Sequence, residues 1–67
     1  MTDRRATLSY VYSRAAEVFG DPERGSAWLE RPNRAFDDRA PLELLETEHG
    51  AHLVVQVLGR IEHGIAG

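Results

Sequence analysis

The sequence has no cysteine, no lysine and no long hydrophobic run among its 67 residues. The absence of cysteine excludes disulfides, thiolate zinc sites and cysteine nucleophiles. No apolar stretch approaches the roughly 20 residues that a membrane-spanning helix needs. Residues 1–5 are polar and lead into an amphipathic segment, which is unlike a secretory signal. A cytoplasmic protein is therefore expected.

An excess of basic residues is also lacking. Acidic residues number 11 against 8 basic ones, and the formal net charge is −3. Nucleic-acid-binding modules usually carry a basic excess on one face, so this balance argues against DNA or RNA as the main partner. A chain of this length forms one domain and buries only about 60% of the surface that its unfolded form exposes. Oligomerisation or a partner often supplies the missing burial, and we expect a homodimer or a larger assembly with a partner.

The first half of the chain predicts two helices. Apolar residues recur with a 3.6-residue period over about residues 7–19, and Gly20 is placed to end this helix. Asp21 and Pro22 are typical of an N-cap and a first helical position. The second helix is expected to end before Pro32. Residues 31–40 have no helical period, and we expect an ordered loop that is anchored by Phe36.

The second half predicts a short helix and a long one. Pro41 begins the short helix, Thr47 is the expected N-cap of the last helix, and Gly64 is its expected C-cap. The apolar stripe of this last helix consists of Leu53, Val54, Val57, Leu58 and Ile61. The prediction is an all-α single domain over residues 1–67, with residues 1–6 as a short arm and the longest helix at the C-terminus. The residues expected to be buried together are Phe19, Trp28, Leu45, Leu53 and Val57.

Patterns typical of catalysis or metal binding are incomplete. His49 and His52 are three residues apart, whereas the zinc-protease motif needs two histidines four apart with a glutamate between them. Gly20 and Gly25 frame four residues, but the Lys-Ser/Thr pair of a phosphate-binding loop does not follow, and helix punctuation accounts for both glycines. Nothing resembles a nucleophile elbow. We expect no enzymatic activity, no metal and no cofactor.

Three residues off the main stripes suggest a binding surface. Val55 lies beyond the edge of the last helix's stripe, where it is either a singly exposed valine or part of a second buried surface. Gly59 inside a helix costs about 1 kcal/mol relative to alanine, so it is either tolerated on a hydrated face with His52, Gln56 and His63 or approached by a partner. Tyr10 falls on the polar side of the first helix and is the expected exposed aromatic. Trp28 is expected in the core.

The order of four motifs goes further than composition. They are Ala-Glu-Val-Phe-Gly-Asp-Pro at 16–22, Ala-Trp-Leu-x-x-Pro-Asn at 27–33, Pro-Leu-Glu-Leu-Leu-x-Thr-x-x-Gly at 41–50 and Val-Leu-Gly-Arg-Ile-Glu-His-Gly at 57–64. Together they resemble the Xre/MbcA/ParS toxin-binding domain over about residues 14–66. No single motif is specific, but four in this order and spacing make a strong match.

The resemblance implies an antitoxin that binds and inhibits a RES-domain toxin, an enzyme that degrades NAD. In this family the C-terminal part of the domain is implicated in covering the toxin's active site, and that part corresponds to residues 61–65 of this chain. Ile65, which follows the expected cap, pairs with Ile61 in this hypothesis and enters the toxin's cleft. The alternative is that Ile65 folds back on the last helix, a common hydrophobic contact around C-caps. The residues expected to bind the toxin are Gln56, Gly59, Arg60, Ile61, His63, Gly64 and Ile65.

Two departures from the family pattern qualify the expectation. His63 stands where the family often has tyrosine, and about six residues precede the first helix, where many members carry a helix-turn-helix domain. DNA-binding autoregulation through this chain is therefore not expected. The alternative is a dimeric DNA-binding or regulatory protein, for which the last helix offers only Arg60 and histidines as basic residues.

Overall fold

The computed structural model describes residues 4–66, and the side chains of residues 5–64. This part of the chain forms four α-helices and one 3₁₀ helix: α1 (Arg4–Phe19), α2 (Pro22–Glu30), η1 (Arg34–Phe36), α3 (Pro41–Leu44) and α4 (Glu48–Ala66). The predicted all-α class, with the longest helix last, is confirmed. Within residues 4–66 no helix is both long and apolar enough to cross a membrane.

Local capping chemistry sets most helix boundaries where they were predicted. Gly20 follows α1 with φ of 71°, in the left-handed region that glycine adopts readily. The Asp21 carboxylate accepts a hydrogen bond from the Arg24 backbone N–H at 3.3 Å, which caps α2. The Thr47 hydroxyl oxygen accepts one from the Gly50 N–H at 2.9 Å, immediately before α4. These boundaries follow from neighbouring residues alone.

Two predicted helix ends are wrong. α1 begins at Arg4 rather than near Thr7, because arginine and alanine favour helix even where no apolar period marks it. Residues 4–6 of the predicted arm thus belong to α1, and residues 1–3 lie outside the described residues. Gly64 does not cap α4, which continues through Ala66. A glycine ends a helix only where the backbone turns into the left-handed region, and Gly64 keeps its helical conformation.

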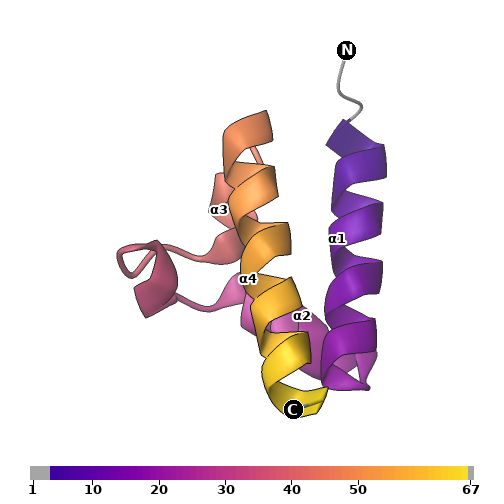
Figure 1. Cartoon of the computed structure of the whole chain (residues 1–67). Helices are drawn as coiled ribbons and strands as arrows, with labels where there is room; N and C mark the ends of the chain where they lie inside the picture. The colour runs from indigo at the N-terminus through magenta and orange to yellow at the C-terminus, as the bar shows by residue number, and fades with distance from the viewer. Residues whose placement is uncertain (1–3, 67) are drawn as a thin grey trace.

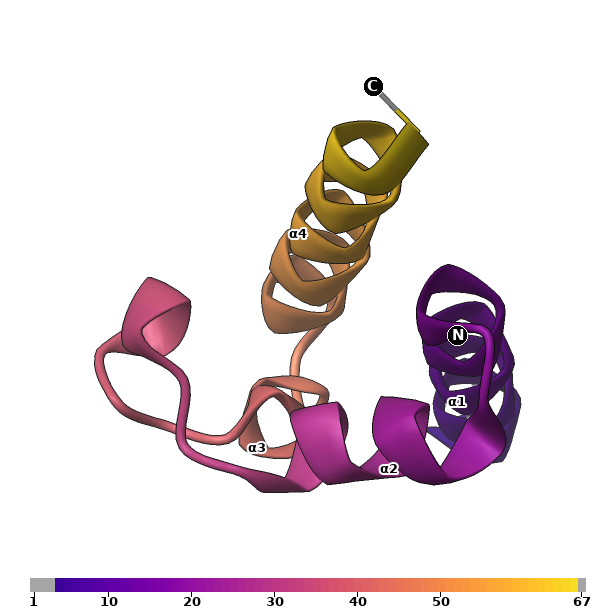
Figure 2. The same cartoon turned by 90° about the horizontal axis from the view of Figure 1, so that it is seen from below.

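The helices form an open, three-sided arrangement. α1 and α4 run side by side in the same direction, and α3 lies on the other side of α4 (Figure 1). Seen from below, α2 crosses the base and joins the α1 side to the α3 side (Figure 2). The connection between α2 and α3 is closed by an isolated bridge between Asn33 and Arg39. Phe36, the predicted anchor of this connection, is buried with 7% exposure.

The core lies where α1, α2 and α4 meet. Its fully buried apolar residues, at 0% exposure, are Val11, Ala15, Leu29, Val54 and Leu58. Of the residues predicted to be buried together, Leu45 is buried, whereas Phe19, Trp28, Leu53 and Val57 are only partly buried against the cluster. The predicted stripe on α4 is correct, but the helix turns its edge rather than its centre toward α1. Beside Leu53 lies a shallow groove that α3 and Arg39 of the η1 connection also line.

Trp28 supports the core from its edge. Its ring lies between Phe19 and Phe36, at centroid distances of 5.9 Å and 6.3 Å, in tilted and edge-on arrangements that aromatic pairs favour. The expectation of a core tryptophan is thus met only in part, because the indole remains half-exposed.

Two glycines are required by close packing between elements. A Cβ on Gly25 would lie 2.8 Å from the backbone of Ala15 and Ala16, where α2 meets α1. A Cβ on Gly50 would overlap the carbonyl oxygen of Leu44. Gly25 was predicted to punctuate a helix, but it lies inside α2. Its function is to let two helices approach.

Candidate protein-binding surface

One face of α4 is left uncovered by the other helices. It consists of His52, Gln56, Gly59, Arg60 and His63, and we call it the α4 outer face. The last four of these residues follow the i, i+3, i+4, i+7 spacing that places side chains on one side of a helix. All except the half-buried Gly59 are exposed. The structure therefore brings four of the seven predicted toxin-binding residues together in a row.

Gly59 opens a gap in this row. A Cβ built on Gly59 would meet no atom within 4 Å, so no close approach within the described chain explains the glycine, unlike Gly25 and Gly50. A helix-interior glycine without such a contact carries its cost of about 1 kcal/mol uncompensated. Arg60 beside it takes part in no ion pair described for residues 4–66. The outer face thus presents open backbone next to an available guanidinium.

The remaining predicted residues are placed differently. Ile61 is partly buried and packs against the core, so it faces away from the outer face. Gly64 is exposed. Ile65 lies inside α4, and its side chain is outside the described ones. The expectation that Ile65 follows a helix cap is therefore wrong, since the helix does not end at Gly64.

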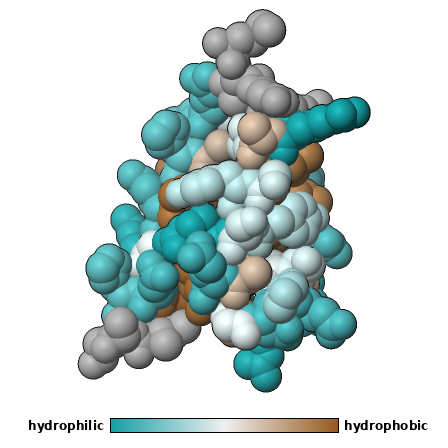
Figure 3. Space-filling model, turned by 90° about the vertical axis from the view of Figure 1, so that its right-hand side faces the viewer, coloured by the Kyte–Doolittle hydropathy of each residue, from teal (hydrophilic) through white to brown (hydrophobic). Residues whose placement is uncertain are grey.

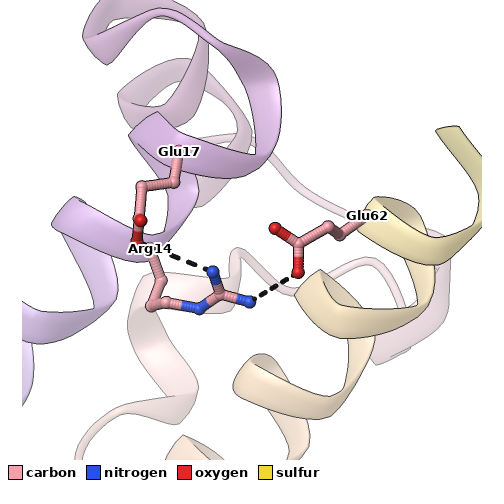
Figure 4. A network of polar contacts seen from close by, with 3 residues as sticks. All are labelled: Arg14, Glu17 and Glu62. Atoms are coloured by element: carbon pink, nitrogen blue, oxygen red, sulfur yellow. Dashed lines mark hydrogen bonds and ion pairs between the residues drawn. The ribbon is translucent and has the colours of Figure 1, made fainter. Parts of the chain in front are cut away.

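An ion-pair network joins the end of α4 to α1. The Arg14 Nη2 donates a hydrogen bond to the Glu62 Oε1 at 3.0 Å, and its Nη1 lies 3.6 Å from the Glu17 Oε1 (Figure 4). The hydrogen bond from Arg14 lowers the pKa of Glu62, and the same bond raises the pKa of Arg14. The Arg14 side chain is only 23% exposed.

Sequence reasoning missed this pair for a physical reason. Arg14 and Glu62 are 48 residues apart, and periodicity only sorts residues into faces of one helix. The sequence does place a charged residue within one turn of the apolar positions on each of the two helices. That pattern occurs in most amphipathic helices, so it does not predict a particular ion pair.

A shallow groove between the upper parts of α1 and α4 holds the off-stripe apolar residues. Tyr10, predicted to be exposed, has 54% exposure beside it. Val55 is partly buried on its α4 side, so the structure favours the second buried surface that its position suggested. The full lining is Ala6, Thr7, Tyr10, Val11, Ala51, His52 and Val55, with no formally charged residue. The side of the molecule formed by α1 has a pale, weakly polar centre with hydrophilic residues around it (Figure 3).

The described residues show no cluster of three or more metal-ligating side chains. His49 and His52 are both exposed at the start of α4. The surface has exposed hydrogen-bond donors, accessible helix backbone at Gly59 and an uncharged groove beside Tyr10. These features suit contact with another protein.

Comparison with known proteins identifies a related family. Residues 14–64 match the family described as the antitoxin Xre/MbcA/ParS C-terminal toxin-binding domain. The chain is 38% identical over 65 residues to an "Antitoxin Xre" of Photorhabdus laumondii and 37% identical over 65 residues to one of Yersinia enterocolitica. A third, from Pseudomonas putida, is 29% identical over 63 residues.

The first two matches cover 96% of this chain but only 44% of each relative, and the third covers 94% and 40%. The chain thus spans less than half the length of these relatives. No solved structure matches it at a significant level. The family match covers the α1–α2 junction, the η1 connection and most of α4, and the chain belongs to the Xre/MbcA/ParS family of antitoxin toxin-binding domains.

Proposed function

We propose that this domain is the inhibitory part of an antitoxin and silences a RES-domain, NAD-degrading toxin by laying the second half of α4 over its active site. Family membership carries the proposal, since the matched region is named for toxin binding. The relatives named Antitoxin Xre support the same role. The domain acts by binding and not as an enzyme. Because its target consumes NAD, it acts in the cytoplasm.

The α4 outer face supports a direct role in contact. Gln56, Arg60 and His63 can donate hydrogen bonds, and arginine is enriched among residues that dominate interface energies. Gly59 lets a partner's backbone approach the helix. Gly64 and Ile65 continue the proposed contact to the end of α4, while Ile61, which packs against the core, holds this turn of the helix in place. In this arrangement the segment acts as a helix rather than as an extended tail.

Binding to the toxin also stabilises the folded state of the domain. A partner that binds only the folded state raises the free energy of unfolding by mass action. A 67-residue domain without cysteine has little stability to spare. We further propose that it forms a homodimer or a larger assembly with the toxin.

The test is co-expression with the RES-domain protein that we expect the adjacent gene to encode. Deletion of Ile65–Gly67 should leave the domain folded and weaken toxin inhibition by tenfold or more, equivalent to about 1.4 kcal/mol. Arg60→Ala and His63→Ala should each weaken inhibition without lowering the Tm. NAD turnover by the purified toxin is the readout for inhibition, and circular dichroism is the readout for folding.

Ser13→Ala on α1 is the control, because this exposed residue lies outside the proposed contact. Full inhibition by the truncated domain would restrict the contact to the outer face. Full inhibition by the truncated domain and by both single variants would overturn the role of α4. An intact domain that neither binds nor inhibits the RES-domain protein would overturn the proposed function itself.

A further inference from the structure

Burial changes along α4 within the side chains that the structure describes, up to residue 64. Val54 and Leu58 are fully buried, Ile61 is partly buried, and His63 is exposed. On the core-facing side of α4, the described burial thus falls from Val54 and Leu58 to Ile61, where the proposed toxin contact begins. Two helix-weakening glycines, at positions 59 and 64, fall in this same stretch. A contact with another helix would therefore help to hold residues 61–64 in place.

The Arg14–Glu62 hydrogen bond supplies that contact. Among the hydrogen bonds and ion pairs described for residues 61–64, it is the one that joins α4 to another helix. It lies one residue from both Ile61 and His63, so it acts on the turn that carries the proposed contact. Glu62 is 45% exposed while Arg14 is 23% exposed, so the fixed partner is the arginine on α1.

We propose that Arg14 is a positioning residue for toxin binding: through Glu62 it holds the last turns of α4 against α1, so that the outer face is ordered before the toxin arrives. This inference rests on the proposed function. α1 carries none of the proposed contact residues, yet through Arg14 it contributes to the affinity of the domain for the toxin. Ordering a binding segment beforehand reduces the entropy that binding must supply.

The fork of the guanidinium suits this role. Arg14 uses different nitrogens for Glu17, one turn along α1, and for Glu62 on α4 (Figure 4). The contact with Glu17 keeps the side chain on the α4 side of its helix, and the shorter bond with Glu62 connects the helices. A lysine carries one nitrogen in place of this fork, so Arg14→Lys is expected to restore only part of the effect of Arg14.

The first experiment uses the free domain. Amide hydrogen exchange at residues 60–64 should become fivefold faster or more in Arg14→Gln, while exchange in α2 stays unchanged. Glu62→Gln should give a similar acceleration, and the double variant little more than either single one, because each substitution removes one of the two charges that strengthen the same hydrogen bond. Arg24→Gln, on an exposed arginine of α2, is the control for loss of charge. Unchanged exchange at residues 60–64 in Arg14→Gln would overturn the proposal.

The second experiment measures the Kd for the RES-domain protein by calorimetry. Arg14→Gln should weaken binding by fivefold or more in the parent chain but by less than twofold in the Glu62→Gln background. An undiminished effect in that background would mean that Arg14 touches the toxin directly, which contradicts a positioning role. If the parent chain does not bind the protein at all, the proposed function fails and the role in binding fails with it, even where the exchange result shows that the bond orders α4.

Discussion

At the scale of single residues, two glycines inside helices have opposite surroundings. A Cβ on Gly25 would lie 2.8 Å from the α1 backbone, whereas a Cβ on Gly59 would meet nothing within 4 Å. The close packing of α2 against α1 therefore explains Gly25, whereas no contact within the described chain explains Gly59. The same residue type at similar helical positions has an internal role in one case and, as we propose, an external role in the other.

This contrast gives a prediction for Gly25→Ala. The added methyl group must push α2 away from Ala15 and Ala16, and overpacking of this kind costs about 1–3 kcal/mol. The gain in helix propensity, about 1 kcal/mol, reduces this to a net cost of up to about 2 kcal/mol. We expect the Tm to fall by several degrees, since 1 kcal/mol corresponds to about 4–8 °C in a domain of this size.

Gly59→Ala is the matched control, because it gains the same helix propensity in open space. Thermal melts of the free domain followed by circular dichroism should place Gly59→Ala at or above the parent. A Gly25→Ala variant that melts as high as the parent would contradict the close approach of α1 and α2.

At the scale of the elements, the sequence predicted helices better than their packing. Asp21, Pro22 and Thr47 mark helix starts because capping depends on residues within one turn, and the structure confirms all three. The choice of Val54 and Leu58 over Leu53 and Val57 as the buried pair depends on where α1 and α3 lie. Packing between helices decides which residues of the stripe are buried most deeply, and the periodicity of a single helix does not predict it.

The candidate site divides in the same way. The row of Gln56, Gly59, Arg60 and His63 was predictable because it follows one helix's period. The continuation of α4 through Gly64 and the bond between Arg14 and Glu62 were not. The continuation of α4 depends on whether the backbone of Gly64 stays helical or turns into the left-handed region. The Arg14–Glu62 bond depends on contact between helices that are far apart in the sequence.

The link between α1 and α4 should make stability depend on pH. The bond from Arg14 lowers the pKa of Glu62 below its usual value of 4.5. Its ionised form therefore stabilises the fold above pH 4.5, and this stabilisation is lost as the pH falls below that value through the folded-state pKa. Glu62→Gln should have a lower Tm than the parent at neutral pH, and the difference should shrink as the pH falls below 4.5. Melts across this range check it.

Glu17→Gln removes the same charge from the longer contact of 3.6 Å and should give a smaller difference at neutral pH. A gap between Glu62→Gln and the parent that stays constant down to acid pH would show that the carboxylate's charge is not what links the helices.

At the scale of the whole molecule, the two surfaces described above meet at His52 and extend from it in different directions, so they can be used together. The α4 outer face extends to the C-terminal end of the helix, whereas the groove beside Tyr10 lies between the upper halves of α1 and α4. The outer face carries donors, and the groove carries no formal charge. A chain with net charge −3 meets a copy of itself with least repulsion through an uncharged surface. The groove is therefore the expected contact between two copies, which leaves the outer face for the toxin.

This division predicts that stability depends on protein concentration. If two copies pack through their Tyr10 grooves, dilution separates them and removes the stabilisation that association adds. The Tm of the parent should rise when the concentration is raised about a hundredfold through the micromolar range. Tyr10→Asp places two like charges in a symmetric contact and should give a lower Tm that no longer depends on concentration. Ser9→Asp, an exposed position on the same helix about 100° away, should behave as the parent does. Light scattering that shows a monomer at high micromolar concentration, together with a Tm that does not change on dilution, would contradict the homodimer.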